Sequence, residues 1–313
     1  MNDSKEPLPK VIVITTGGTI ACTADERGAL IPTVSGQELV QPVAQRFAGN
    51  LEIEVRELNR LDSSSMDFGD IDEILQASHD ALDEEHVIGV VVTHGTDSME
   101  ETAIALDTFH NDPRPIVLTG AQKPFNHPQS DGPGNLFEAV MVASDTSARD
   151  IGVLVVFGHA VLPARGCVKW HAQDELAFAT NGPEEPLRAE PVAPQHLKGI
   201  AVPIISAYPG ADGHLVRAAI EQGAQGLVIE GMGSGNVGTA MAQALDEALE
   251  ADIPVVITTR VPRGEVAGTY GGAGGGSTLA HKGAIGSTYF RAGQARVLLA
   301  IAIASGVHPA TLF

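Results

Sequence analysis

The stretch Val11-Ile12-Val13-Ile14-Thr15-Thr16-Gly17-Gly18-Thr19-Ile20-Ala21 carries the strongest local signal in the chain. Its first half is a run of apolar β-branched residues, which favours a buried strand of a parallel sheet. The two glycines that follow let the backbone turn sharply and approach a ligand closely. Ligands of open α/β sheets bind at the carboxyl ends of the strands. This strand end is therefore either a ligand-binding turn that carries a nucleophile or holds an anion, or an ordinary exit from a strand.

Length and composition restrict the class of protein. The chain has 313 residues, of which 43% are apolar, so it can bury the core of one large or two medium domains. A formal net charge of −20 argues against nucleic acid as a partner, because phosphate binding requires a basic face. The two cysteines, Cys22 and Cys167, are too few for a disulfide framework or a metal cluster. No apolar signal segment or membrane-length run is present, so we expect a cytoplasmic protein without a membrane partner.

Strand-like apolar runs alternate with helical patterns along the chain, which predicts parallel sheets connected by helices. We expect strands at 51–58, 87–92, 115–119, 152–157, 200–205, 226–230 and 254–259. We expect helices at 35–47, 70–82, 98–110, 131–144, 214–222, 237–250 and 292–305. Residues 22–33 are predicted to form a loop, and the glycine-rich residues 264–286 are predicted to be irregular.

The regular pattern is interrupted once, at a segment that resembles an interdomain linker. Residues 181–195 contain four prolines and several charges but no clear period. We therefore predict an α/β fold in which residues 1–180 form a larger N-terminal domain with a mostly parallel sheet flanked by helices. Residues 181–197 are predicted to be a linker, and residues 198–313 a smaller C-terminal α/β domain.

Hydroxyl and carboxylate side chains follow three of the predicted strands. Because the carboxyl ends of parallel strands meet at one edge of a sheet, we expect these side chains to lie close together. They are Thr16, Thr19, Ser63, Ser64, Ser65, Thr96 and Asp97.

A hydroxyl nucleophile requires a base and donors that hold an oxyanion. Lys169 follows the strand predicted at 152–157 and can reach the same edge, where a desolvated lysine could act as a base or polarise a hydroxyl. The competing interpretation of Lys169 is an ordinary solvated surface charge.

Other polar residues near these strand ends have structural interpretations. Glu100 and Glu101 fall in the first turn of a predicted helix, where acidic residues favour the helix dipole. His94 is interpreted as a structural donor at a strand end. Asp131 is interpreted as a helix cap.

A rival class of enzyme comes from Gly233-Ser234-Gly235-Asn236-Val237-Gly238, which matches the dinucleotide-binding fingerprint between a predicted strand and helix. A nicotinamide-dependent oxidoreductase is therefore an alternative. The next strand ends in Thr258-Thr259-Arg260, however, and not in the acidic residue that binds a ribose. The glycine cluster at 271–276 lacks the Lys-Ser/Thr ending of a phosphate loop, so we interpret it as flexible backbone.

Two long segments resemble the signature segments of the bacterial L-asparaginases, in the asparaginase/glutaminase family. They are Thr16-Gly17-Gly18-Thr19-Ile20-Ala21 and His94-Gly95-Thr96-Asp97-Ser98-Met99-Glu100-Glu101-Thr102-Ala103. Shorter segments at 62–66, 131–136 and 260–262 recur in the same order, so the resemblance covers nearly the whole chain.

The resemblance implies hydrolysis of L-asparagine to L-aspartate and ammonia without a cofactor. Thr16 would be the nucleophile, a triad of Thr96, Lys169 and Asp97 would assist proton transfer, and Asp97 would also hold the substrate ammonium group. Ser63 would bind the substrate carboxylate. By this resemblance the catalytic residues are Thr16, Thr96, Lys169 and Asp97, and the substrate-binding residues are Ser63, Ser64, Gly95 and Asp97.

The chain departs from the family at the helper of the nucleophile. Members usually carry a tyrosine in the loop after the first segment and receive an acidic group from a neighbouring subunit, yet residues 26–32 contain no tyrosine and that acid is missing. We expect Tyr270 of a partner subunit to enter the site, although a packing tyrosine fits equally. Asn236 would also reach the adjacent subunit's substrate. The resemblance therefore implies a homodimer or homotetramer.

Two further functions remain open. A glutaminase-asparaginase differs only in room for one methylene, which is worth about 1–3 kcal/mol. A non-catalytic amino-acid sensor would keep Asp97 and Ser63 but lose the nucleophile or the lysine. The presence of Thr16, Thr96 and Lys169 favours an enzyme acting on a small amino-acid substrate.

Overall fold

The computed structural model describes residues 7–183 and 187–313. The chain divides into two units, Met1–Ala179 and Thr180–Phe313, each with its own sheet. Part of the predicted linker at 181–197, residues 184–186, lies outside the described residues.

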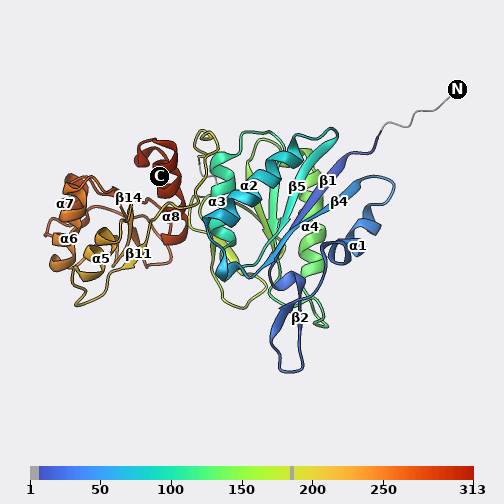
Figure 1. The fold of residues 1–313 in the computed structure, drawn as a ribbon, viewed down its shortest axis with the longest axis horizontal. Coiled ribbons are helices and arrows are strands. Elements are labelled where there is room, and N and C mark those ends of the chain that lie inside the picture. Colours follow the sequence, from blue (N-terminus) through green and yellow to red (C-terminus); the bar gives the residue numbers. More distant parts are fainter. Residues whose placement is uncertain (1–6, 184–186) are drawn as a thin grey trace. The chain divides into compact units, whose positions relative to one another are not determined.

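A six-stranded sheet forms the centre of the first unit, with strands in the order β4-β1-β5-β6-β7-β8 (Figure 1). Neighbouring strands run parallel, apart from β8, which is antiparallel to β7. The predicted α/β class with a mostly parallel main sheet is thereby confirmed. The strands are β1 (Lys10–Gly17), β4 (Glu52–Leu61), β5 (Val87–Thr93), β6 (Ile116–Thr119), β7 (Val153–Phe157) and β8 (Ala160–Pro163).

Helices cover both faces of this sheet, which explains why its central strands β5, β6 and β7 are almost entirely apolar. Helices α1 (Gly36–Phe47) and α4 (Gly132–Ser144) lie on one face. Helix α2 (Phe68–Leu82) contacts β1 and β5, and helix α3 (Met99–Phe109) contacts β7. The two helices also contact each other.

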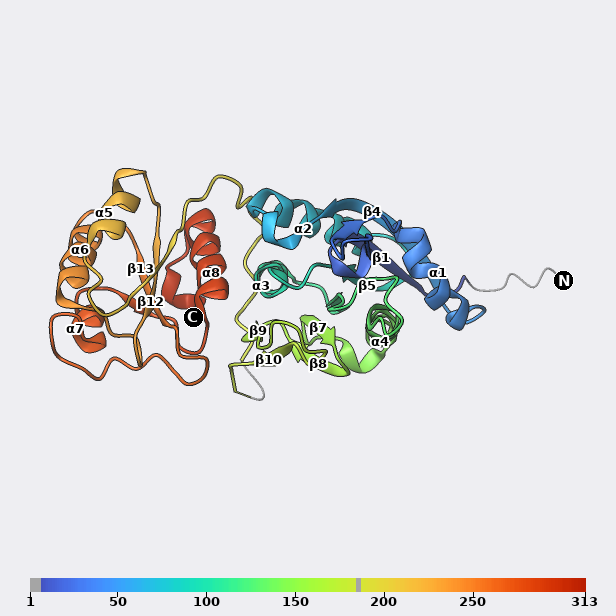
Figure 2. The same ribbon diagram turned by 90° about the horizontal axis from the view of Figure 1, so that it is seen from below.

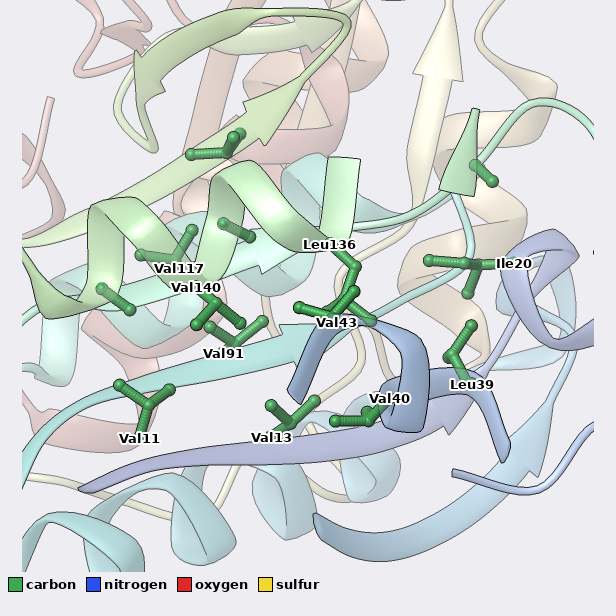
Figure 3. Packing of buried hydrophobic residues seen from close by; sticks show 14 of the residues in the cluster. Val11, Val13, Ile20, Leu39, Val40, Val43, Val91, Val117, Leu136 and Val140 are labelled. Carbon is green, nitrogen blue, oxygen red and sulfur yellow. The ribbon is translucent and has the colours of Figure 1, made fainter. Parts of the chain in front are cut away.

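Successive side chains of β1 point to opposite faces of the sheet. Val11 and Val13 pack against α1 and α4 (Figure 3), while Ile12 and Ile14 point to the other face, and all four are fully buried. Burial of aliphatic side chains stabilises a fold by about 1.5–3 kcal/mol each. The run Val11–Ile14 therefore anchors both layers of helices to the strand that leads into Thr16.

Helices α1 and α2 begin at residues whose side chains cap them, whereas the corresponding side chain at α4 is engaged elsewhere. Ser35 accepts a hydrogen bond from the backbone N–H of Glu38 at the start of α1, and Asp67 forms a capping box at the start of α2. Asp131 occupies the N-cap position of α4, but its side chain makes no cap hydrogen bond. Its carboxylate instead accepts the backbone N–H groups of Gln122 and Lys123, so the prediction of Asp131 as a side-chain cap is wrong.

Two segments predicted to lack regular structure contain short elements. Residues 22–33 form an antiparallel hairpin of β2 (Cys22–Ala24) and β3 (Leu30–Pro32), which projects from the first unit in Figure 1. The Asp25 carboxylate closes its turn by accepting two backbone N–H groups. Residues 264–286 include α7 (Gly276–His281) and β14 (Ile285–Gly286). Both predictions failed because these elements are too short to show a period.

The second unit is a four-stranded parallel sheet with helices on both sides (Figure 2). Helices α5, α6 and α7 pack on one face, around a core that includes Val216, Leu245 and Leu279, and α8 lies on the other face. Its remaining elements are β11 (Ile204–Ser206), β12 (Leu227–Gly231), β13 (Val255–Thr259), α5 (His214–Glu221), α6 (Thr239–Glu250) and α8 (Ala292–Ser305). In the described parts of both units, no helix has the length and apolarity needed to span a membrane.

His94 connects β5 to α3 and is fully buried. Its Nδ1 donates to the carbonyl oxygen of Gly95 at 2.7 Å, and its Nε2 lies 2.9 Å from the Thr102 hydroxyl. Burial lowers the pKa of His94 from 6.5 to about 4, partly offset by the Gly95 carbonyl. A neutral ring that uses both nitrogens inside the fold agrees with a structural role.

We expect acid to destabilise the first unit through His94. The group's pKa is depressed in the folded state, so its stabilising contribution is complete above pH 6.5 and is lost as the pH falls toward 4. A shift of this size corresponds to about 3 kcal/mol. Urea unfolding of wild type and His94→Gln at a series of pH values measures the effect. The exposed His159 supplies the control, and equal pH dependence in wild type, His94→Gln and His159→Gln would contradict the prediction.

Candidate active site

The strand order creates a ligand-binding position beside β1. From β1 the chain crosses to β4 on one side and then returns past β1 to β5 on the other side. Open α/β sheets bind ligands at such a switch point, at the carboxyl ends of the strands. Thr15 of β1 is directly opposite Thr93 of β5. Thr16 and the loop that carries Thr96 therefore leave the sheet side by side.

The turn after Thr16 depends on both of its glycines. Gly17 and Gly18 have φ values of 100° and 77°, which residues with a Cβ rarely adopt. A Cβ on Gly18 would lie 2.5 Å from backbone atoms of Gly95, so the two loops are in direct contact. This contact keeps the end of β1 against the loop that follows β5.

Thr16 is almost completely buried, and its Oγ1 donates to the carbonyl oxygen of Thr93 at 3.0 Å. The neighbouring strand thus orients the hydroxyl. For Thr16 to act as a nucleophile, its hydroxyl proton must be transferred to a base and no longer be donated to the Thr93 carbonyl oxygen. Thr19, the second threonine of the turn, begins a short 3-10 helix, η1 (Thr19–Ala21).

Lys169 contacts two polar residues of the loop after β5. It ends β9 (Cys167–Lys169), and its Nζ donates to Thr96 Oγ1 at 2.8 Å and to Asp97 Oδ1 at 2.7 Å. The Lys169 side chain is 20% exposed and Thr96 is buried, whereas the Asp97 side chain is 61% exposed. This arrangement differs from a solvated surface lysine, because the ammonium group is directed at a buried hydroxyl.

Ser63 belongs to the 3-10 helix η2 (Ser63–Ser65), which follows β4. Its Oγ accepts the backbone N–H of Asp97 at 3.1 Å, and its carbonyl oxygen accepts the Ser98 hydroxyl at 2.7 Å. A Cβ on Gly95 would lie 2.4 Å from Ser63 Oγ, so the loops after β4 and β5 also touch. Ser64, the next residue of η2, is exposed. The structure therefore brings the predicted hydroxyl residues of three strand ends together.

Gln122 contacts this group and was missed by the sequence analysis. Thr96 Oγ1 donates to Gln122 Oε1 over a long 3.5 Å, and Gln122 Nε2 donates to the carbonyl oxygen of Asp174 at 3.1 Å. The Thr96 hydroxyl thus lies between Lys169 and Gln122. Its position in the sequence could have identified it, because Gln122 follows β6 and so lies at the same edge of the sheet as the other residues.

Glu100 has a second role that the helix-dipole interpretation did not include. Its Oε2 accepts the backbone N–H of Lys169 at 2.5 Å. Burial, and then the charge of Glu101, raise the pKa of Glu100 to about 8. No local pattern identifies this contact, because the two residues are 69 positions apart.

Asn236 and Tyr270 both lie in the second unit. Asn236 Oδ1 accepts the backbone N–H of Gly276 at 3.2 Å, and its backbone pairs with Met232. Tyr270 precedes α7 and is 64% exposed, so its ring contributes little to packing. The neighbouring glycines make close backbone contacts, since a Cβ on Gly274 would lie 2.0 Å from the Val237 carbonyl oxygen.

One glycine of the dinucleotide-like segment, Gly235, is required by close packing. A Cβ on Gly235 would lie 2.7 Å from a side-chain carbon of Val266, and Gly231 closely approaches Gly235. The contact with Val266 accounts for Gly235 without a bound nucleotide, whereas a Cβ on Gly233 or Gly238 would make only ordinary van der Waals contacts. Among residues 7–183 and 187–313, we find no group of three or more His, Cys, Asp or Glu side chains arranged to hold a metal ion.

Comparisons with known proteins cover both units. Residues 10–195 match the family model described as asparaginase, N-terminal, and residues 201–312 match the glutaminase/asparaginase C-terminal domain. The L-asparaginase of Bacillus licheniformis is 34% identical over 95% of this chain and 96% of its own. A probable L-asparaginase of Deinococcus radiodurans is also 34% identical, over 96% of this chain and 94% of its own.

A solved structure shows the same fold. The crystal structure of a probable cytoplasmic L-asparaginase from Campylobacter jejuni matches with a TM-score of 0.82 and 28% identity, covering 97% of each chain. The resemblance noted in the two threonine-containing segments thus extends over both units. The chain belongs to the asparaginase family.

Proposed function

We propose that this protein hydrolyses the side-chain amide of L-asparagine to L-aspartate and ammonia. Its membership of the asparaginase family and its full-length similarity to L-asparaginases support this reaction. The observation that carries the proposal is the Lys169 ammonium group in contact with Thr96 and Asp97, in the loop after the strand that pairs with Thr15 of β1. A cation, a hydroxyl and a carboxylate are thus in direct contact in the loop region next to β1.

The same residues suit an amino acid that carries both charges. Lys169 engages Oδ1 of Asp97, and the exposed part of this carboxylate is available to the substrate ammonium group. Ser63 Oγ accepts a hydrogen bond from Asp97 N, so its own proton can be donated to the substrate carboxylate. Ser64 is the adjacent exposed hydroxyl, and Gly95 lines the space beside Ser63.

In the proposed reaction Thr16 Oγ attacks the amide carbon and loses its proton. Backbone N–H groups near Gly17 and Thr96 stabilise the oxyanion. The amide nitrogen gains a proton and leaves as ammonia, which produces an ester on Thr16. Water, positioned by Thr96 with Lys169, then attacks the ester and releases L-aspartate. All atoms come from the substrate, water and the protein, so the reaction needs no cofactor.

We further propose that a neighbouring copy of the chain completes the site in a homodimer or homotetramer. Asn236 and the exposed Tyr270 are the contributing residues. The support is their position in the family pattern and the exposure of the Tyr270 ring, together with the absence of tyrosine from residues 26–32. A cytoplasmic location stays a prediction, and the related protein of Campylobacter jejuni is described as probably cytoplasmic.

The first test is an ammonia assay on the purified protein with L-asparagine, L-glutamine and both D-isomers. We expect L-asparagine to yield ammonia and L-aspartate in equal amounts, because the hydrolysis releases one of each. Absence of ammonia from all four compounds would refute the proposed reaction and favour the amino-acid sensor. Comparison of kcat/KM for the two L-amino acids separates an asparaginase from a glutaminase-asparaginase.

Replacement of Lys169 tests the proposed triad. Lys169→Ala removes the cation that contacts Thr96 and Asp97, so we expect kcat for L-asparagine to fall about 10²–10⁴-fold, as for loss of an acid–base group. Lys282→Ala is the matched control, because Lys282 also pairs with a carboxylate, that of Asp246 in the second unit. Equal activity of the two variants would exclude the proposed role of Lys169.

Subunit complementation tests whether sites are shared. We expect Thr16→Ala and Asn236→Ala chains to have low activity separately and to regain activity when they are unfolded and reassembled together. In a mixed dimer, one site then combines an intact Thr16 with an intact Asn236. The same experiment with Tyr270→Phe tests the phenol. A failure to regain activity in assemblies shown to contain both chains would contradict the shared site. Wild-type turnover by Tyr270→Phe would show that the phenol of Tyr270 has no role in the site.

A further inference from the structure

We propose that Glu100 is a positioning residue that fixes the backbone of β9, so that the ammonium group of Lys169 stays between Thr96 and Asp97. The inference deepens the proposed function and rests on it for the role of Lys169. Its basis is geometric: one turn of the chain, from Thr96 to Glu100, contacts Lys169 at both ends.

The first contact is at the tip of the lysine. Thr96 and Asp97 precede α3 and accept hydrogen bonds from Lys169 Nζ at 2.8 and 2.7 Å. The second contact is at the backbone, where Glu100 Oε2 accepts the Lys169 N–H at 2.5 Å. A lysine side chain has four rotatable bonds, so contacts at its tip alone leave its backbone free to shift. The pairing of β9 with β10 (Phe178–Thr180) holds one side of this strand, and the Glu100 contact fixes the Lys169 N–H itself.

The surroundings of Glu100 show that its carboxylate is not an ordinary helix-dipole group. A first-turn acid that serves the dipole is normally exposed, as Glu38 is in α1. Glu100 instead points into the protein toward β9. A charged group is costly to bury unless a partner compensates it, and the N–H of Lys169 is such a partner.

Four titratable groups define the charge balance here. Burial and the neighbouring Glu101 raise the pKa of Glu100 to about 8, and Lys169 opposes this shift through its backbone N–H and its charge. Cys167, on the same strand as Lys169, is buried, and burial followed by the charge of Glu100 raises the pKa of its thiol. With these neighbours, Glu100 ionises within the pH range in which enzymes are commonly assayed.

The ionised carboxylate is the stronger acceptor, because a hydrogen bond to a charged group is shorter and stronger than one to a neutral group. The positioning of Lys169 is therefore firmest above pH 8, and kcat should rise as the pH increases through this value. The pH dependence of stability has the opposite sign to that of kcat. The raised pKa means that the contribution of Glu100 to the free energy of unfolding is present below pH 4.5 and is lost as the pH rises through 8.

The experiment compares Glu100→Ala, Glu100→Gln and the control Glu38→Ala, which removes an exposed first-turn acid from α1. We expect kcat of Glu100→Ala for L-asparagine to fall about 10–10²-fold, as for a small misplacement of a reacting group, with KM changed less than about threefold. Glutamine keeps the acceptor oxygen, so Glu100→Gln should recover to within about threefold of wild type at pH 6–7. Because it cannot ionise, its kcat should not rise across pH 8.

Two outcomes would overturn the inference: a kcat rise across pH 8 in Glu100→Gln equal to that of wild type, or a folded Glu100→Ala with wild-type kcat. If Glu100→Ala does not fold, as judged by circular dichroism, the pH profile of Glu100→Gln decides. Failure of the proposed function gives a different pattern, in which wild type releases no ammonia or Lys169→Ala keeps full turnover. An inactive Lys169→Ala together with a Glu100→Gln variant that keeps the wild-type rise of kcat across pH 8 refutes the inference alone.

Discussion

The close approach of three loops at the edge of the main sheet is the constraint on which the candidate site depends. Gly18 lies so near Gly95 that a Cβ would overlap backbone atoms, and Gly95 lies equally near the Ser63 hydroxyl. A flexible side chain can move aside, but a peptide backbone held by a sheet cannot. The contact between Gly18 and Gly95 therefore fixes the distance between two strand ends, and the contact of Gly95 with Ser63 involves the Cβ of Ser63, which cannot rotate away. The turn that carries Thr16 and the two loops that carry the proposed substrate contacts form one packed unit.

The sequence was sufficient to predict the main elements because their signals are local. An apolar β-branched run such as Val11–Ile14 must be buried, and Ser35 can cap α1 without any distant partner. The three-residue strands β2 and β3 and the six-residue helix α7 gave no such signal, and they were missed for this reason. Asp131 shows the other limit. Its carboxylate had two possible sets of backbone donors, and the tertiary structure selected those of the loop after β6.

The residues of the candidate site also fall into those that local sequence could predict and those that it could not. The hydroxyl residues could be grouped in advance, because each one follows a strand and parallel strands end at one edge. The contacts of Lys169 depend on how β9 folds back onto α3, which no periodicity encodes. Glu100 illustrates the consequence. A first-turn position explains an acid there, yet it does not reveal that the side chain accepts a hydrogen bond from a strand 69 residues later.

The hairpin after the first threonine segment lacks the expected tyrosine but is connected to the site by backbone contacts. The carbonyl oxygen of Cys22 accepts the N–H of Phe125, and Ala24 exchanges hydrogen bonds with the side chain of Asn126 at 3.0 and 3.3 Å. The loop that supplies these partners begins at Gln122, whose amide oxygen contacts Thr96. The hairpin thus supports the surroundings of Thr96 through the loop after β6. The hairpin therefore has a structural connection to this loop although it supplies no phenol.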